Sequence, residues 1–199
     1  MQRSFAKPSS TSAPSDAVGV PRVRLLTERI SSAVALLAVA VWMGGLLALG
    51  ALAAPVVFAV VPLPTSADAM TIVFRRFDAV AMVCAALVLV MEAARAANGA
   101  RPRFDRARSV FSLLAAILAV FQGIFVSPRI AHLHALGVRP GPVSSSGSAA
   151  MGASLSRLHE VAVACAQTQV VLLAVVVALH VVTLSSARGH LVDKPGSPV

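Results

Sequence analysis

The stretch from Ile30 to Ala54, ISSAVALLAVAVWMGGLLALGALAA, contains 25 residues and no Asp, Glu, Lys or Arg. A helix needs about 20 apolar residues to cross a hydrocarbon core of roughly 30 Å, because each residue adds about 1.5 Å. The segment 161–184 meets the same condition. Both segments are therefore predicted to span a membrane.

Two further apolar segments, 74–97 and 108–127, lie between these spans, and the first has only thirteen uncharged residues, 79–91, between Asp78 and Glu92. They reach membrane length only if the side chains of Arg95 and Arg108 extend to the lipid head groups. The four segments together predict an all-α integral membrane protein, a four-helix bundle with up-down topology.

The composition supports this class. Hydrophobic residues make up 57% of the chain and charged residues 13%, against about 25% charged residues in an ordinary soluble domain. Lipid must therefore cover much of the surface. The net charge of +9 does not indicate nucleic-acid binding, because no basic stretch is interleaved with aromatic residues and Tyr is absent.

Lys and Arg residues are distributed unevenly over the predicted connections, with twelve on one side of the membrane and five on the other. In membrane proteins the cytoplasmic segments next to membrane helices carry the excess of Lys and Arg. Both termini are therefore predicted to lie in the cytoplasm, and the membrane is the inner membrane if the protein is bacterial. The five residues of the outer side are Arg75, Arg76, Arg129, Arg139 and Arg157.

Breaker residues suggest the limits of the domain and its helices. Residues 1–24 and 187–199 are predicted to be disordered cytoplasmic tails around a transmembrane domain of residues 25–186. The first helix is expected to stop at Pro55, since proline removes a backbone donor. The segment Gly137–Gly152, rich in Gly, Pro and Ser, is expected to be a flexible loop.

Two of the helices are predicted to be longer than the membrane is thick. The second has no breaker between Thr65 and Asn98. The third is expected to run from Asp105 to Leu136, with a kink at Pro128 and Gly137 as its stop. The last helix, with Ser154 as its expected cap, also starts before its apolar segment. Three of the four helices are therefore expected to extend beyond the membrane on the outer side.

Small residues recur every four positions on one face of the first predicted helix, at Ala40, Gly44 and Ala48. Such residues permit close approach of helix backbones in lipid, where the hydrophobic effect between helices is weak. This face is predicted to pack against another helix of the chain or of a partner.

Several polar residues fall inside the predicted spans. Glu92 and Arg95 share a helix face, and either an interfacial ion pair or a proton or ion relay fits them. Gln169 and His180 are separated by three turns plus about 20° and also share a face. Hydrogen bonds between helices, or a polar path, are expected for the set Gln122, Gln167, Gln169 and His180.

A further polar group is predicted at the outer membrane surface. Its charged members are Arg75, Arg76, Asp78, Arg129 and Arg157, and its candidate metal ligands are His132, His134, His159 and Glu160. Imidazole suits zinc, copper or nickel, yet the first two histidines differ by about 200° around a helix. The alternatives are a metal or anion site and a hydrogen-bonded cap in which Arg75 pairs with Asp78.

No nucleophile-and-base motif, phosphate-binding loop or pair of zinc-type Cys motifs is present. The protein is therefore expected not to be an enzyme, and no cofactor is expected.

Three motifs resemble the transmembrane-protein-205-like family of small four-helix membrane proteins, most of them of unknown function. They are Trp42-Met43-Gly44-Gly45, Ala54-Pro55-Val56-Val57-Phe58 and Phe74-Arg75-Arg76-Phe77-Asp78, with Leu158-His159-Glu160 opening the last helix. The resemblance implies a membrane location and the same topology. The Trp-x-Gly-Gly motif also resembles the membrane domain of copper-resistance proteins, which would imply copper binding by the outer histidines.

Two functions remain open. The first is a structural or interaction module, with the lipid bilayer and either a second copy or another membrane protein as partner. The second is metal or small-solute handling or tolerance, with the outer histidines as the point of uptake and the intramembrane glutamines as a path.

Overall fold

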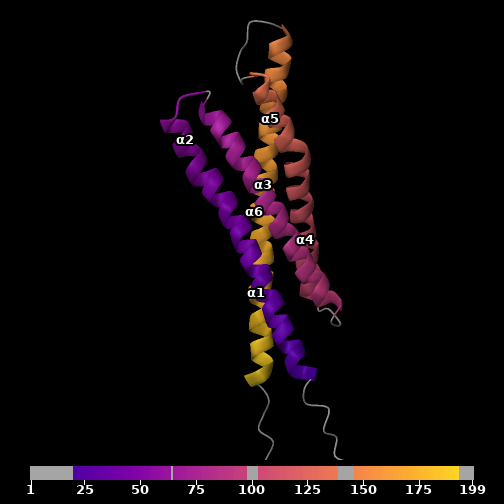
Figure 1. Cartoon of the computed structure of the whole chain (residues 1–199). Helices are drawn as coiled ribbons and strands as arrows, with labels where there is room; N and C mark the ends of the chain where they lie inside the picture. Colours follow the sequence, from indigo (N-terminus) through magenta and orange to yellow (C-terminus); the bar gives the residue numbers. More distant parts are fainter. Residues whose placement is uncertain (1–19, 64, 98–102, 139–145, 193–199) are drawn as a thin grey trace, which may run out of the picture.

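The computed structural model describes residues 20–63, 65–97, 103–138 and 146–192 (Figure 1). Predictions for residues 1–19, 98–102, 139–145 and 193–199 lie outside the described residues. Within the described ranges every regular element is a helix and no β-strand is present. In chain order these are α1 (Val20–Leu47), the π-helix η1 (Ala48–Ala53), α2 (Ala54–Val60), α3 (Thr65–Ala97), α4 (Arg103–Phe121), the π-helix η2 (Gln122–Val126), α5 (Ser127–Ala135) and α6 (Ser146–Val192).

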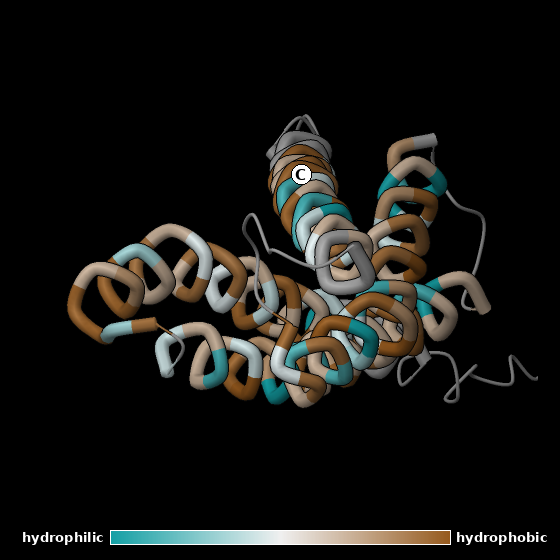
Figure 2. Tube along the Cα trace, turned by 90° about the horizontal axis from the view of Figure 1, so that it is seen from above, coloured by the Kyte–Doolittle hydropathy of each residue, from teal (hydrophilic) through white to brown (hydrophobic). Residues whose placement is uncertain are grey.

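The described residues contain four continuous helical stretches that are long and apolar enough to cross a membrane. They are Arg29–Val60, Thr65–Ala97, Phe104–Ala135 and Ala150–Thr183. In each of them only 22% to 33% of the most apolar window is buried inside the protein. Figure 2 shows apolar residues, in brown, recurring along every helix. Water cannot cover so much apolar surface without a large free-energy cost, so lipid is its natural environment.

The helices pack around a narrow apolar interior. α1 and α4 each contact both α3 and α6. Figure 1 shows both ends of the described chain at one end of the molecule, on the same side as the connection between α3 and α4. The end of α2 and the start of α3, and likewise the end of α5 and the start of α6, lie at the opposite end. The first described helix therefore begins at the same end of the molecule at which the last one finishes.

The first helix does not stop at Pro55, contrary to the prediction. It continues through η1 and α2 to Val60. A proline inside an α-helix lacks the N–H for one backbone bond and its ring meets the carbonyl of the preceding turn. The π-helix immediately before Pro55 widens that turn, so the helix can continue.

A π-helix also precedes Pro128, the second of the two prolines within the four helical stretches. η2 ends one residue before Ser127, and Pro128 occupies the first turn of α5. The predicted stop of this helix is confirmed: Gly137 adopts a positive φ of 74°. The N–H of Val138 then bonds to the carbonyl of Leu133, and that of Gly137 bonds to His134. This is a Schellman C-cap, which requires a left-handed residue that glycine adopts without strain.

The tail and loop boundaries were predicted too generously. α1 already begins at Val20 and α6 continues to Val192, so parts of both expected tails are helical. Pro21 lies in the first turn of α1, where its missing N–H costs no helical bond. α6 begins at Ser146, inside the expected loop Gly137–Gly152. Small residues such as Ala149 and Ala150 continue the helix there, since alanine has the highest helix propensity.

Candidate functional site

Asp78 lies inside the protein rather than at its outer surface. Its side chain is buried, with only 6% of the residue exposed. α3 has 33 residues, about 50 Å, and Asp78 lies about 20 Å from its first residue. A core of roughly 30 Å within this helix includes Asp78, with the exposed Arg75 and Arg76 less than one turn nearer the outer end. The expected ion pair between Arg75 and Asp78 is not formed, because the carboxylate turns toward other helices.

A chain of hydrogen bonds connects Asp78 to the other three membrane-crossing helices. The indole Nε1 of Trp42 in α1 donates to Oε1 of Gln169 in α6 at 3.1 Å. Nε2 of Gln169 donates to Oε1 of Gln122 in η2 at 3.0 Å, and Nε2 of Gln122 donates to Oδ1 of Asp78 at 3.3 Å. We call Trp42, Gln169, Gln122, Asp78 and Ser127 the upper polar layer.

The donor-to-acceptor direction of these hydrogen bonds follows from Trp42. The indole N–H is only a donor, so the carbonyl oxygen of Gln169 must face Trp42. The amide group of Gln169 then faces Gln122, and the amide group of Gln122 faces Asp78. Every donor in the chain therefore points toward the carboxylate, which is the final acceptor.

Ser127 completes the upper polar layer from α5, where its hydroxyl donates to Oδ2 of Asp78. This contact depends on η2, since Gln122 is the first residue of the π-helix, Ser127 follows its last residue, and both reach the same carboxylate. Gly123, within η2, would bring an added Cβ within 3.6 Å of the Cβ of Asp78. The helices are thus close together at this point. Single π-turns inside α-helices are frequent at functional sites.

A second buried group, the lower polar layer, consists of Glu92, Arg95, Asp105, Arg108, Ser109 and His180. Arg108 donates two hydrogen bonds to Glu92, at 2.8 and 3.2 Å. Ser109 donates a third at 2.7 Å. Arg108 is 1% exposed, so its side chain does not extend to the head groups as the sequence suggested. It is an interior cation that pairs α4 with α3.

The rest of the lower polar layer surrounds this ion pair. Arg95 lies 3.6 Å from Glu92, at the predicted i,i+3 spacing, and 3.5 Å from Nε2 of His180. His180 is buried and its Nδ1 lies 3.0 Å from the carbonyl of Val176. Nη1 of Arg108 lies 3.1 Å from Asp105 but without hydrogen-bond geometry. Glu92 therefore has two cationic neighbours.

An apolar layer of small residues separates the two polar layers. Asp78 and Glu92 are 14 residues apart, about 21 Å along α3 and within about 40° of the same face. Gln169 and His180 are about 17 Å apart along α6. The intervening interior is rich in alanine, including Ala81, Ala85, Ala115, Ala116 and Ala119. The alanines allow close helix packing and leave no polar connection between the layers among these residues.

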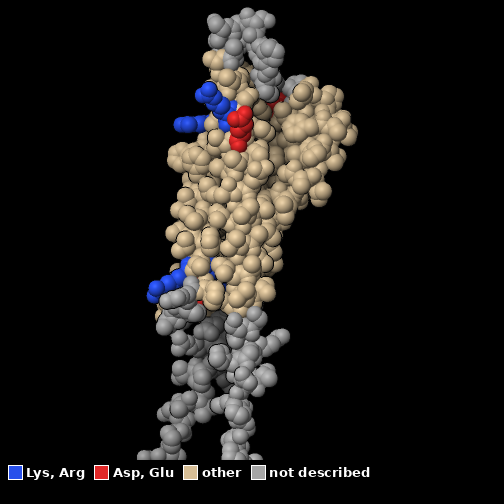
Figure 3. Space-filling view, turned by 180° about the vertical axis from the view of Figure 1, so that it is seen from behind, with Lys and Arg blue, Asp and Glu red and all other residues tan. Residues whose placement is uncertain are grey.

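The residues predicted at the outer surface do not converge. Arg75, Arg76, Arg129 and Arg157 are exposed, as are His132, His159 and Glu160. Figure 3 shows charged residues near the two ends of a broad uncharged belt. His134 instead contacts α3: its Nδ1 lies 2.9 Å from Oγ1 of Thr71 and 3.9 Å from Asp68. Within the described part of the chain no three His, Cys, Asp or Glu residues are placed to hold a metal ion.

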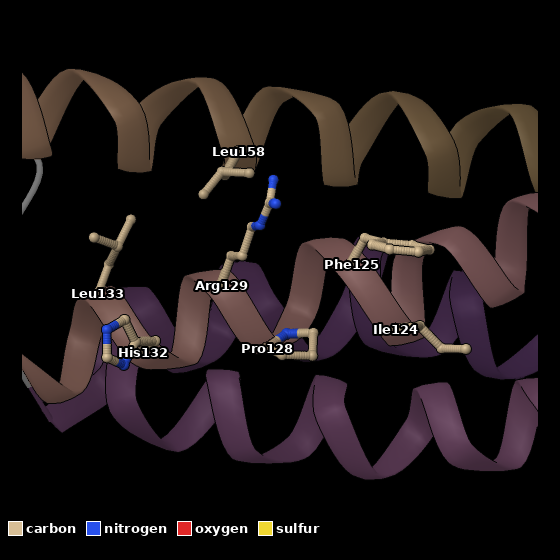
Figure 4. A pocket seen from close by; sticks show the side chains of 7 residues that line it. All are labelled: Ile124, Phe125, Pro128, Arg129, His132, Leu133 and Leu158. Atoms are coloured by element: carbon tan, nitrogen blue, oxygen red, sulfur yellow. The ribbon is translucent and has the colours of Figure 1, made fainter.

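A groove of 370 Å³ runs between α5 and α6. Figure 4 shows the Arg129 side chain reaching toward Leu158 of α6, while His132 points in a different direction. The other residues that line the groove are Ile124, Phe125, Pro128 and Leu133. The groove is mainly apolar and its two polar side chains do not meet, so it is not a polar binding site.

The small-residue face of α1 does not pack inside the protein. Ala40, Gly44 and Ala48 are exposed, and an added Cβ at Gly44 would meet no atom within 4 Å. The contact with α3 uses Gly45 instead, where an added Cβ would collide with the ring of Phe77. The motifs 42–45 and 74–78 thus touch each other directly. Gln167 is also exposed and lies apart from Gln122 and Gln169.

Residues 37–139, just over half of the chain, match the sequence profile of a family described as a domain of unknown function, DUF4149. The chain belongs to this family. The region matched by DUF4149 includes both motifs that meet at Gly45, and the Asp78, Glu92 and Arg108 side chains. α6 lies beyond it. Comparison with curated proteins and with solved structures gives no match.

Three polar contacts in this DUF4149 protein were not predicted. Trp42 was expected to fill space, but it also donates a hydrogen bond. Ser127 carried no signal beyond its place before Pro128, and Arg108 was interpreted as an interfacial residue. A charge that lies so near a predicted span is the one signal that could have identified Arg108, because such charges are usually paired inside membrane proteins.

Proposed function

We propose that this DUF4149 protein is a non-enzymatic structural or interaction module of the inner membrane, a four-helix bundle that associates with a second copy or another membrane protein. The observation that carries the proposal is the upper polar layer, which joins all four membrane-crossing helices. Its side chains bond across helices and thereby fix one arrangement of the bundle. Such an arrangement presents a constant outer face to a partner.

The face proposed for association is that of Ala40, Gly44 and Ala48. It supports the proposal because small side chains allow two helix backbones to approach within lipid. The added Cβ at Gly44 meets nothing within 4 Å, so a larger side chain there should leave the chain's own fold intact. Loss of assembly on substitution can therefore be assigned to the face itself.

The test compares Gly44→Leu with Gly50→Leu in the full chain, reconstituted in lipid and labelled for energy transfer between copies. Gly50 is equally open and lies two residues from Ala48, on another side of the helix, so it is a matched control. We expect assembly to fall in Gly44→Leu and to persist in Gly50→Leu. Equal energy transfer in both variants and in the wild type would overturn the use of this face.

We further propose that both termini are cytoplasmic and that the bundle has up-down topology. The proposal is supported by the ratio of twelve to five Lys and Arg residues between the two sides. Single-cysteine variants Arg106→Cys and Arg157→Cys test it, with Cys84 and Cys165 replaced by Ala. A membrane-impermeant maleimide applied to intact cells should label Arg157→Cys, and should label Arg106→Cys only after permeabilisation. The opposite labelling pattern would reverse the orientation.

We also infer a relation to transmembrane-protein-205-like proteins. The relation is supported by the direct contact of Gly45 with Phe77, because this contact explains why the motifs 42–45 and 74–78 occur together in one protein. A solved structure of one of those proteins in which the corresponding aspartate lay outside the helix interior would contradict the relation. Metal handling by the outer histidines finds no such support, because His132, His134 and His159 do not converge in the described structure.

A further inference from the structure

Asp78 receives two hydrogen bonds, but its negative charge has no counter-ion. None of the described Lys, Arg or His side chains lies within ion-pair distance of its carboxylate, whereas Glu92 has Arg108 at 2.8 Å and Arg95 at 3.6 Å. A carboxylate that has left water without a partner charge is strongly disfavoured in a membrane interior. The upper polar layer therefore supplies hydrogen bonds to both carboxylate oxygens of Asp78 but does not neutralise its charge.

The elements packed around Asp78 do not supply the missing charge. α1 contributes Trp42 to this layer, and α6 contributes Gln169, both uncharged. The charged side chains of the neighbouring segments are exposed: Arg75, Arg76, Arg129, His132, Arg157, His159 and Glu160. The thiols of Cys84 and Cys165 are buried in α3 and α6 but cannot carry a positive charge. His134 faces Thr71 and Asp68, two to three turns from Asp78. The described residues therefore leave the charge of Asp78 to be neutralised by a group other than themselves.

The oxygen atoms around Asp78 are suited to a small cation. Both carboxylate oxygens and Oγ of Ser127 meet where η2 passes into α5. A hydroxyl can accept as well as donate a hydrogen bond. Carboxylate and hydroxyl oxygens are hard donors, the type that hard cations prefer.

We propose that Asp78, Ser127 and Gln122 form an intramembrane binding site for a monovalent cation, H⁺ or Na⁺, which neutralises the carboxylate. A proton would bind Oδ2 of Asp78, whose O–H then donates to Oγ of Ser127 while Oδ1 still accepts from Gln122. Na⁺ would instead coordinate the carboxylate and the hydroxyl oxygen. In either case the bound cation joins α3 to α5.

The experiment uses the full chain in nanodiscs and combines infrared spectroscopy with thermal unfolding. A protonated carboxyl group has a C=O stretching band that a carboxylate lacks. Spectra are recorded for wild type, Asp78→Asn and Glu92→Gln at neutral pH. Melting temperatures are measured in NaCl and, at equal ionic strength, in choline chloride. Glu92→Gln is the matched control, because it removes a buried carboxylate that already has cationic partners.

Either of two results supports the proposal. A C=O band that is lost in Asp78→Asn, retained in Glu92→Gln and insensitive to Na⁺ identifies a proton. A rise in melting temperature specific to NaCl, lost in Asp78→Asn and retained in Glu92→Gln, identifies Na⁺. Absence of both signals from the wild type, or their persistence in Asp78→Asn, overturns it.

A second variant keeps the test decisive if Asp78→Asn does not fold. Ser127→Ala removes one hydrogen-bond partner of the carboxyl group, so it should shift the frequency of the C=O band or abolish the Na⁺-specific stabilisation. A wild-type signal that Ser127→Ala leaves unchanged would overturn the site. This result is independent of the association face, since none of these variants alters Ala40, Gly44 or Ala48.

Discussion

The ion pair between Arg108 and Glu92 should contribute more to stability than any other single contact between these helices. Arg108 is 1% exposed and donates hydrogen bonds of 2.8 and 3.2 Å to the carboxylate. Removing one partner of a buried ion pair costs about 3–5 kcal/mol, because the other charge is left in a medium of low dielectric constant. Arg95 and Ser109 still contact Glu92 after the change. We therefore expect Arg108→Met to lower the free energy of unfolding by about 3 kcal/mol, the lower end of that range.

The double variant Glu92→Gln/Arg108→Met separates the ion pair from general packing. It leaves no unpaired charge at this position, so its loss should be smaller than that of Arg108→Met alone. We expect a coupling energy of about 1.5–3 kcal/mol between the two sites. Arg106→Met is the control: the same substitution two residues away on an exposed position should change stability by no more than about 0.5 kcal/mol.

The assay is reversible unfolding in mixed micelles, followed by tryptophan fluorescence. Trp42 is the only tryptophan of the chain and is fully buried, so its emission reports the helix interior without a label. A loss below about 1 kcal/mol in Arg108→Met would refute the assigned magnitude. A double variant that is as unstable as the sum of the single variants would refute the pairing itself.

Three further changes test other contacts, again by unfolding. Gln169→Leu removes the acceptor of the Trp42 indole and should cost about 0.6–1.7 kcal/mol while changing the tryptophan emission maximum; unchanged emission would contradict the bond. Ser112 is buried with no partner for its hydroxyl among the described residues, so Ser112→Ala should stabilise the protein by up to about 1 kcal/mol, and a clear loss would show that the hydroxyl is bonded. His134→Ala removes the contact with Thr71 and should lower the free energy of unfolding by about 0.5–1.5 kcal/mol. Thr71→Val should give the same loss, and the double variant should lose no more than either single variant.

The membrane class and the limits of the second and third helical stretches could be predicted because they depend on local properties of the chain. A run such as 30–54 must be covered by lipid wherever it packs, and Gly137 stops a helix through its own backbone freedom. Pro55 was an exception, as were the start of α1 and both limits of α6. Pro55 looked like a stop, but a π-turn before it preserves the helix. Whether a proline ends or only modifies a helix depends on packing on both sides of it.

Several polar residues of the candidate site were identified from the sequence, but their arrangement was predicted wrongly. Gln122, Gln169 and His180 were identified as intramembrane polar residues, and they are buried. Asp78 was assigned to the outer surface because it lies at the outer end of its predicted apolar segment, with Arg75 three residues earlier as a candidate ion-pair partner. Its actual partners come from 44 and 49 residues further along the chain. No local pattern indicates such pairings.

The sequence by itself determined that this chain crosses a membrane with four helices, because apolar length and charge spacing are properties of each segment alone. Only the tertiary structure decided which polar residues meet. Lipid neither donates nor accepts hydrogen bonds, so each buried polar group must find a partner on another helix. That partner depends on helix rotation, which Gly45 and Phe77 set between α1 and α3 and η2 sets for Gln122 and Ser127. Asp78 is therefore an interior carboxylate by virtue of packing.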